Sequence, residues 1–425
     1  MKRILTALLA LLLVLLSVAC GKKSGDDPEV FTPSLDRETA CTITVVGHYD
    51  NFEALEKEFD RFGEYYPNVV LKYEKKDNYN KIISTVLKEE NPDIFFSFPW
   101  MIESEENRAL FECAEDLTDP ALGIYLSCIR DGLLNKDADG KITQVPIYTT
   151  TYGMLINEKI FEAANLSVPK TYDELIDVCG KLKDAGYANP IMGYNKNSSM
   201  LYSLFFPYFC GTISENREAV RALNETPGSA GEYARGALNL IADFMGRGFV
   251  NLENCNQIAD DYNAVIKRFF EGDVPIMLAS GSTVSGTEKR EKQSDAFTAN
   301  PFKYSFHPVP STAEGGYFLN TISLSFSVNK NSENLAVANE FMRFLVRTSE
   351  LNQMALSKRM VTPCKDMKLD EIYRAFGEVG EKRTIYMYDL GLADAPDKQV
   401  RLAGAQVTNG TMTVDEAVRA FGTLK

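Results

Sequence analysis

Three short apolar segments alternate with two amphipathic segments early in the chain, and this alternation limits the folds that the chain can adopt. The apolar segments, CTITVVG over 41–47, VVLKY over 69–73 and DIFFS over 93–97, are rich in β-branched and aromatic residues and predict strands. Between them, apolar residues recur at helical spacing, namely Phe52, Leu55, Phe59 and Phe62, and then Tyr79, Ile82, Ile83, Val86 and Leu87. Strands and helices that alternate through such short links predict a parallel sheet covered by helices.

The carboxyl ends of parallel strands meet at one edge of a sheet, and ligands of such sheets bind there. Two loops, 47–51 and 97–100, follow predicted strands and are therefore candidates for binding. Trp100, the single tryptophan of the chain, is predicted to stack on a bound molecule, because an indole offers a flat apolar face and a polar edge. The alternative is that Trp100 packs beneath its loop, beside Phe98 and Pro99.

The length and charge of the chain limit its class and its partners. The 425 residues exceed one ordinary hydrophobic core and predict two domains. With 45 Lys and Arg against 59 Asp and Glu, the formal net charge is −14. This balance argues against nucleic acid and anionic lipid as partners, because both carry negative charge themselves.

The first residues have the three parts of a secretory signal. Lys2 and Arg3 precede an unbroken apolar run over residues 4–16, and residues 17–19 are small. A helix that spans a membrane needs about 20 apolar residues, so this run is too short for one. We therefore expect residues 1–19 to be a signal peptide.

The segment Leu-Ser-Val-Ala-Cys that ends at Cys20 resembles the lipobox of bacterial lipoproteins. This resemblance implies a lipid-modified Cys20 that anchors the protein in the bacterial cell envelope, on the periplasmic or outward-facing side. Ser17 departs from the pattern, in which leucine is usual. Residues 20–40 would then be the lipidated N-terminus and a flexible tether, since the residues after Cys20 are polar and contain Gly, Pro and Ser.

Besides Cys20, the chain has seven cysteines, which predict buried thiols rather than a disulfide scaffold. They are Cys41, Cys113, Cys128, Cys179, Cys210, Cys255 and Cys364. The number is odd, no pair has CxxC spacing, and disulfide scaffolds are typical of much smaller secreted domains. Most of these cysteines stand among apolar neighbours and are expected to behave as small hydrophobic residues.

The sequence contains no convincing catalytic or metal-binding motif. Its two histidines, His48 and His307, stand apart from other metal-type ligands. Residues 167–170 match the Ser-x-x-Lys pattern of penicillin-recognising enzymes, but a proline lies inside the match and the partner motifs are missing. Residues 135–140 imitate an EF-hand loop, yet Pro146 stands where a bidentate glutamate is required. We therefore predict no catalytic residues, no metal and no cofactor.

The stretch from Gly140 to Leu175 carries an ordered series of motifs. It contains a Gly-Lys hairpin, Pro146, a strand that ends in Asn-Glu-Lys, an Asn-Leu turn and the helix start Pro-Lys-Thr-Tyr-Asp-Glu-Leu. In the last motif, Thr171 and Glu174 have the spacing of a capping box. This order resembles the extracellular solute-binding proteins of family 1, the group that contains the maltose-binding protein. Similar fragments follow at 270–281, 308–328, 331–345 and 413–421, so that the resemblance runs from about Ile43 to the end.

The resemblance implies a two-lobed, periplasmic-binding-protein-like α/β fold. Each lobe would be a mostly parallel sheet flanked by helices, and crossover strands near Thr151 and near Ile322 would join the lobes. The expected division is 41–151 and 323–370 for lobe 1, and 152–322 and 371–425 for lobe 2.

The resemblance also implies a function. Members of this family bind a small solute in a cleft between the lobes, close by a hinge motion and deliver the solute to an ABC permease. A sugar or oligosaccharide is the expected solute, since aromatic and hydroxyl-bearing residues dominate the candidate loops. Two alternatives are a non-sugar solute, such as a polyamine, a metal chelate or an amino acid, and a surface lipoprotein that acts as a sensor or adhesin. We expect a monomer.

By position, the resemblance maps the family's ligand loops onto this chain. The predicted ligand-binding residues are His48, Tyr49, Asp50, Ser97, Phe98, Trp100, Thr150, Tyr152, Tyr194, Asn195, Ser280 and Ser282. Ser282 stands where maltose binders carry a stacking tryptophan, which argues against maltodextrin as the solute. For Phe98 and Tyr152 the alternative is a place in the hydrophobic core, since aromatic residues serve both purposes.

Overall fold

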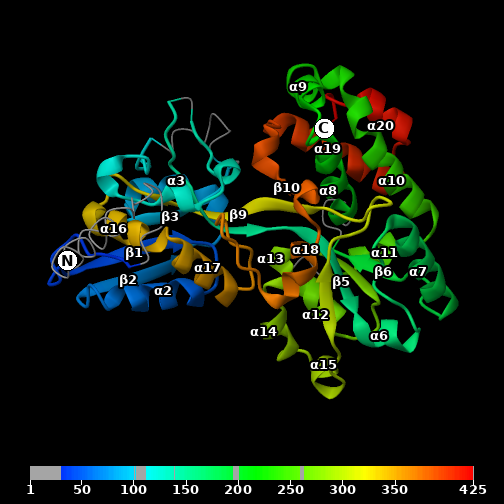
Figure 1. Ribbon diagram of the computed structural model, residues 1–425, viewed down its shortest axis with the longest axis horizontal. Coiled ribbons are helices and arrows are strands. Elements are labelled where there is room, and N and C mark those ends of the chain that lie inside the picture. The colour runs from blue at the N-terminus through cyan, green and yellow to red at the C-terminus, as the bar shows by residue number, and fades with distance from the viewer. Residues whose placement is uncertain are drawn as a thin grey trace, which may run out of the picture.

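The computed structural model describes residues 30–99, 101, 112–137, 139–194, 201–258 and 263–424. These residues form two α/β lobes that lie side by side along the long axis of the molecule (Figure 1). Within the described ranges, no helix has the length and hydropathy needed to cross a bilayer. The predicted signal peptide and Cys20 lie outside the described residues.

Lobe 1 is built on a six-stranded mixed sheet in the order β10-β9-β3-β1-β2, with β4 paired to β9. Its strands are β1 (Cys41–Gly47), β2 (Val69–Lys75), β3 (Ile94–Ser97), β4 (Val145–Thr150) and β9 (Phe318–Val328), whereas β10 (Thr384–Tyr386) pairs with β9 at Phe318–Asn320, the end that lies in lobe 2. β1 is parallel to both β2 and β3, which confirms the prediction from the alternating segments. β9 runs antiparallel to β3 and to β4.

Four helices pack on this sheet through apolar faces. They are α2 (Glu53–Gly63), α3 (Tyr79–Glu89), α16 (Leu335–Leu345) and α17 (Thr348–Ser357). α2 buries the residues that the helical spacing predicted, and the ring centroid of Phe62 lies 5.3 Å from that of Phe341 and 5.6 Å from that of Phe344 on α16. This helix pair fixes one side of the core of lobe 1.

The part of the expected tether that the structure describes packs on lobe 1. Phe31 is buried, with its ring centroid 5.0 Å from that of Tyr65 and 5.3 Å from that of Phe344. The backbone N–H and the hydroxyl of Ser34 donate to the carboxylate of Glu340 at 2.8 and 2.7 Å. The described part of the expected flexible tether is therefore fixed to the lobe, by the buried ring of Phe31 and by several hydrogen bonds.

Lobe 2 contains a four-stranded sheet in the order β6-β7-β5-β8. Its strands are β5 (Tyr152–Asn157), β6 (Ile191–Gly193), β7 (Ile276–Ser280) and β8 (Tyr304–His307). Only the β6–β7 pair is parallel, so this sheet is mixed rather than mostly parallel. The reason is that β5 arrives directly from β4 and not through a helical crossover from a neighbour in its own sheet.

Many short and medium helices surround this second sheet. They are α6 (Glu158–Ala163), α7 (Tyr172–Asp184), α8 (Tyr202–Ile213), α9 (Arg217–Glu225), α10 (Arg235–Gly246), α11 (Leu252–Asn256), α12 (Ala264–Phe269), α13 (Gly281–Val284), α14 (Thr287–Glu291), α15 (Asp295–Ala299), α18 (Arg374–Gly377), α19 (Asp394–Thr408) and α20 (Val414–Ala420). Half of the predicted capping box at Thr171 is present, since its hydroxyl accepts from the N–H of Glu174 at 3.2 Å, but the carboxylate of Glu174 accepts from the N–H of Lys170 at 2.7 Å and not from that of Thr171. At the start of α20, Thr413 and Glu416 form a complete capping box.

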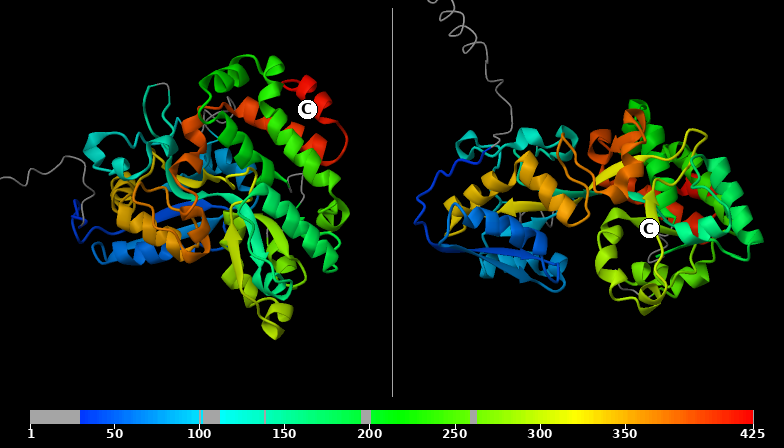
Figure 2. Two further views of the ribbon diagram at one scale, coloured as in Figure 1. Left: turned by 45° about the vertical axis from the view of Figure 1, so that its right-hand side comes forward. Right: turned by 60° about the horizontal axis from the view of Figure 1, so that its bottom comes forward.

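Two strands carry the chain between the lobes. β4 of lobe 1 continues through Thr151 into β5 of lobe 2. β9 begins in the lobe 2 cores with Phe318 and Leu319 and ends in the lobe 1 core with Leu324 and Phe326. The two further views show the lobes connected by these strands (Figure 2).

The seven cysteines of the described part are all free thiols, and five of them are buried. Burial raises the pKa of Cys179 to about 12 and also raises the pKa of Cys210. Thiols held in this protonated state are poor nucleophiles. These cysteines therefore serve packing, as their apolar sequence context predicted.

Candidate functional site

The loop after β1 meets the residue that follows β3. The ring centroid of His48 lies 4.8 Å from that of Tyr49 and 5.7 Å from that of Phe98. The N–H of Tyr49 donates to the hydroxyl of Tyr73 at 2.9 Å, and that hydroxyl donates to the carbonyl of Tyr49 at 3.1 Å. His48 and Asp50 are exposed, whereas Tyr49 and Phe98 are half-buried. The structure thus brings together four of the predicted residues at the carboxyl edge of the sheet.

Ser97 does not join this group. Its side chain is fully buried, and its hydroxyl accepts a hydrogen bond from Ser327 on β9 at 2.9 Å. As the last residue of β3 it points into the lobe, because side chains alternate between the two faces of a strand. The prediction of a ligand contact at Ser97 is therefore corrected to a bond between strands.

A chain of hydroxyl groups lies where the crossing strands meet lobe 2. The Thr150 hydroxyl accepts from the N–H of Ser282 at 2.9 Å and from its hydroxyl at 3.3 Å, and the Ser282 hydroxyl lies 3.2 Å from that of Ser323. The hydroxyl of Ser280 accepts from the N–H of Thr283 and so begins α13. Thr150, Ser282 and Ser323 come from β4, α13 and β9, so this cluster joins both crossing strands to lobe 2.

Tyr152, at the start of β5, lies in an aromatic cluster with α8. Its ring is edge-on to that of Tyr202 with centroids 4.8 Å apart, and the Tyr202 ring stacks on that of Phe206 at 4.4 Å. The guanidinium carbon of Arg401 on α19 lies 4.5 Å from the centroid of Tyr202. Tyr152, which is half-buried, and Arg401, which is exposed, form the accessible part of the cluster.

Arg401 also holds a buried carboxylate. Its Nε donates to Asp397 Oδ2 at 2.8 Å, while Asp397 Oδ1 is buried and has no hydrogen-bond partner among the described residues. Burial raises the pKa of the Asp397 carboxyl, and the positive charge of Arg401 opposes this shift. A buried oxygen without a donor is an acceptor available to a ligand hydroxyl.

The sequence analysis missed Tyr202, Phe206, Asp397 and Arg401. A signal existed in the i, i+4 spacing of Tyr202 with Phe206 and of Asp397 with Arg401, which places each pair on one helix face. Nothing in the sequence indicated that α8 and α19 would meet. Of the other predicted residues, Tyr194 is half-buried beside the core that includes Phe306, and Trp100 and Asn195 lie outside the described residues.

Residues 47–350 match the sequence model of the bacterial extracellular solute-binding proteins. This match covers most of the chain and includes the crossing strands described above. The chain belongs to this family. It is a solute-binding protein of the kind that serves ABC importers, and members of the family bind their solutes without an enzymatic reaction.

Solved structures similar to this solute-binding protein share its two-lobed fold at low sequence identity. The raffinose complex of the binding protein RafE is 18% identical with a TM-score of 0.68, over 90% of this chain and 99% of that chain. A sugar transporter protein from Bacillus licheniformis, solved with stachyose, is 16% identical with a TM-score of 0.61, over 91% and 100%. A chitin oligosaccharide binding protein is 17% identical with a TM-score of 0.64, over 90% and 97%. No curated protein sequence matches the chain.

The solute-binding protein also has a cavity of about 840 Å³ that none of the predicted site residues lines. It lies between β8, the loop over 308–316 and the segment over 370–383. Arg383 in its wall is fully engaged, since it donates to the carbonyls of Gly316 at 2.9 Å and Gly315 at 2.6 Å. These bonds give Arg383 a structural role in holding the loop.

Proposed function

We propose that this solute-binding protein captures an oligosaccharide between its two lobes and delivers it to an ABC permease. The observation that carries the proposal is the set of side chains at the lobe junction. This set has three groups: His48, Tyr49 and Phe98 of lobe 1, the hydroxyls of Thr150 and Ser323 on the crossing strands with that of Ser282 on α13, and the Tyr152 cluster of lobe 2. We infer that the solute contacts all three.

This combination suits a sugar chemically. Aromatic faces pack against the C–H groups of a pyranose ring, and hydroxyl, carboxylate and guanidinium groups hydrogen-bond to its hydroxyls. The free Oδ1 of Asp397 supplies one acceptor, and Arg401 supplies donors beside the rings of Tyr202 and Phe206. The similar proteins that were solved with raffinose, stachyose and acarbose support the same class of solute.

A screen of oligosaccharides by thermal shift, followed by calorimetry, tests the proposal. The panel contains raffinose, stachyose, xylo-oligosaccharides and chito-oligosaccharides, with polyamines and amino acids as the comparison class. A solute at a 100-fold excess over its Kd stabilises the folded state by about 2.7 kcal/mol. Small-angle scattering is expected to show compaction with the same solute, because closure brings the lobes together. A shift with amines or amino acids alone would exclude an oligosaccharide binder.

Trp100 is expected to report on this solute. As the single tryptophan it gives all the indole fluorescence of the protein, and saturating solute is expected to shift its emission if the indole stacks on the sugar. Trp100→Ala is expected to weaken binding roughly ten-fold, equivalent to about 1.4 kcal/mol. Unchanged emission together with unchanged affinity in the variant would remove Trp100 from the site.

Membrane attachment through Cys20 completes the proposed delivery system. In a bacterial host, the full-length protein is expected to partition into detergent and to carry an acylated Cys20 in mass spectra. Since each buried CH₂ contributes about 0.8 kcal/mol, more than one acyl chain would give stable anchoring. Cys20→Ser is expected to abolish acylation and to leave the signal peptide uncleaved. A mature N-terminus at another residue without lipid would contradict this mode of attachment.

A further inference from the structure

The segment that follows α17 is held against α14 of lobe 2 by Arg359. This residue adopts the left-handed conformation, with φ of 49°, and its carbonyl accepts from the hydroxyl of Tyr373 at 3.0 Å. Its guanidinium donates to the Thr287 hydroxyl at 3.0 Å and pairs with Glu288 at 2.8 Å. A non-glycine residue persists in this conformation only where its surroundings hold it, and such residues gather at binding sites.

Lys358, immediately before it, is placed at the lobe junction. Its Nζ lies 5.4 Å from the centroid of the Tyr49 ring, which belongs to the predicted site. Burial lowers the pKa of Lys358, repulsion from Lys289 and Arg290 lowers it further, and Glu53 opposes the shift. Because Arg359 contacts Thr287 and Glu288, Lys358 and the next residues of α14, Lys289 and Arg290, lie on segments that touch.

Lys289 and Arg290 follow Glu288 on α14. Both contribute to lowering the pKa of Asp50, after the larger contribution of its ion pair with Lys75. The Nε and Nη1 atoms of Arg290 are buried and have no hydrogen-bond partner among the described residues. Buried N–H groups of a guanidinium that lack an acceptor are costly unless a ligand supplies one.

The carboxylates of this region are mostly occupied by other partners. Asp50 pairs with Lys75 at 2.9 Å, Glu288 pairs with Arg359, and Glu291 accepts from the hydroxyl of Tyr304. Glu53 alone offsets Lys358 in part. Within the part of the chain that the structure describes, Lys358, Lys289 and Arg290 therefore have no ion-pair partner.

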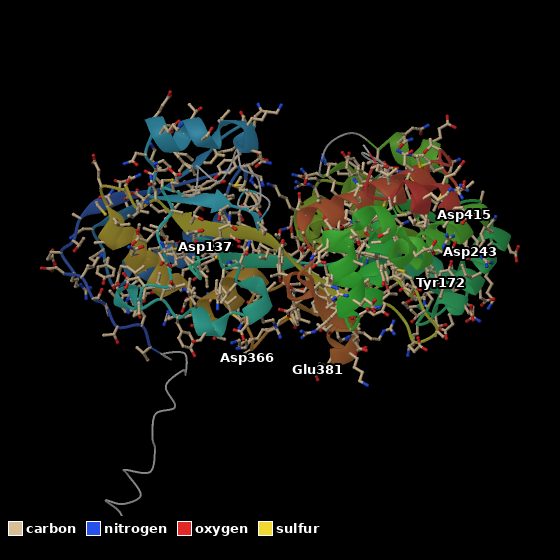
Figure 3. The ribbon with its side chains drawn as sticks, turned by 90° about the horizontal axis from the view of Figure 1, so that it is seen from above. Asp137, Tyr172, Asp243, Asp366, Glu381 and Asp415 are labelled. Carbon is tan, nitrogen blue, oxygen red and sulfur yellow. The ribbon has the colours of Figure 1, made fainter. Side chains whose placement is uncertain are left out.

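The positive charge of this region contrasts with the negative net charge of the whole chain. The chain carries a net charge of −14, and the acidic side chains labelled in Figure 3 are exposed on the outside of the two lobes. They are Asp137, Asp243, Asp366, Glu381 and Asp415. Three unpaired cations gathered at the lobe junction of so acidic a protein point to an anion as their partner.

We propose that the solute is an acidic oligosaccharide whose carboxylate, that of a uronic acid, binds between Lys358 and the pair Lys289 and Arg290. The inference rests on the proposed function and narrows it to one class of oligosaccharide. The carboxylate supplies the acceptor that Arg290 lacks, in a charge-assisted hydrogen bond that is stronger than one to a neutral hydroxyl. The sugar ring meets Tyr49 beside Lys358.

Calorimetry with matched pairs of sugars tests the inference. Each pair differs in one carboxylate: digalacturonate against galactobiose, cellobiouronate against cellobiose, and glucuronic-acid-substituted xylotetraose against xylotetraose. In at least one pair the acidic member is expected to bind ten-fold or more tightly than the neutral member. This preference is expected to shrink when salt is raised from about 50 to about 300 mM, because salt screens the attraction.

Variants that each remove one charge test which residues cause the preference for the acidic sugar. Lys358→Gln and Arg290→Gln are each expected to reduce the preference for the acidic member at least five-fold, and Glu53→Gln is expected to increase it. Lys292→Gln removes a charge just beyond the same helix and is the matched control, expected to leave both affinities unchanged.

The outcomes separate the two proposals. Tight binding of neutral members without any acidic preference would overturn the inference and leave the proposed function standing. Binding of no oligosaccharide would overturn the function, and the inference with it. Tighter binding of a sulfated disaccharide than of its uronate counterpart would overturn the carboxylate assignment.

Discussion

Replacing Gly47 with alanine is expected to destabilise lobe 1 and to disorder the loop that carries His48 and Tyr49. A Cβ at this position would lie 2.5 Å from Cζ of Phe96, closer than any side chain tolerates. The Phe96 ring is fully buried and stacks on that of Phe326 with centroids 5.6 Å apart, so it has no room to retreat. Overpacking of this kind costs about 1–3 kcal/mol or more.

Chemical denaturation and thermal melting of the Gly47→Ala variant measure this effect. A loss of about 2 kcal/mol corresponds to a melting temperature lower by roughly 4–8 °C for a lobe of this size. Gly63→Ala is the matched control, because a Cβ at the end of α2 meets nothing within 4 Å. It is expected to be neutral, or stabilising by up to about 1 kcal/mol through helix propensity. Equal stability of the two variants would refute the close approach at Gly47.

The sequence predicted lobe 1 better than lobe 2, because the signals for lobe 1 are local. Strand and helix periods over 41–97 translate directly into β1, α2, β2, α3 and β3. In lobe 2 the strands are short, and the direction of β5 depends on its connection to β4, which hydrophobic periodicity does not encode. Hydrophobic periodicity also failed to predict the buried position of Phe31, since one aromatic residue in a polar segment gives no periodic signal.

The sequence likewise predicted one part of the candidate site and missed another. His48, Tyr49 and Phe98 followed from the rule that parallel strands end at a common edge, and the same rule selected Ser97, which belongs to the strand and points inward. The aromatic cluster on α8 could not be predicted as a binding site, because this helix is buried on nearly every side and its sequence is typical of a core helix. The contact between Arg401 and Tyr202 joins distant parts of the chain, which only the fold determines.

Replacing Arg401 with methionine is expected to weaken oligosaccharide binding about 100-fold and to lower the free energy of unfolding at neutral pH by about 2 kcal/mol. Methionine keeps much of the packing on Tyr202 and Phe206 but removes the donors and leaves Asp397 as a buried carboxylate without its cation. Breaking a buried pair in this way costs about 3–5 kcal/mol. The smaller value is expected because the Arg401 side chain is 45% exposed and solvent screens the pair.

The pH dependence of this loss follows from Asp397. Burial already raises the pKa of this carboxyl in the folded protein, and loss of Arg401 removes the charge that opposes the shift. A carboxyl with a raised folded-state pKa favours folding below its unfolded pKa, and this contribution is lost as the pH rises through the folded pKa. The deficit of Arg401→Met relative to the parent protein is therefore expected to be largest at pH 7 and to shrink as the pH approaches 4.

The double variant Asp397→Asn/Arg401→Met separates stability from binding. It removes the buried charge as well as its partner, so the melting temperature is expected to recover most of the loss while the affinity stays low. Arg419→Met, at an exposed position on α20, is the matched control and is expected to change neither quantity. Full recovery of binding in the double variant, or an unchanged affinity in Arg401→Met, would mean that the solute does not contact this cluster. Reduced affinity with restored stability would identify Arg401 and Asp397 as direct contacts of the sugar, because their effect on folding would then be removed from the comparison.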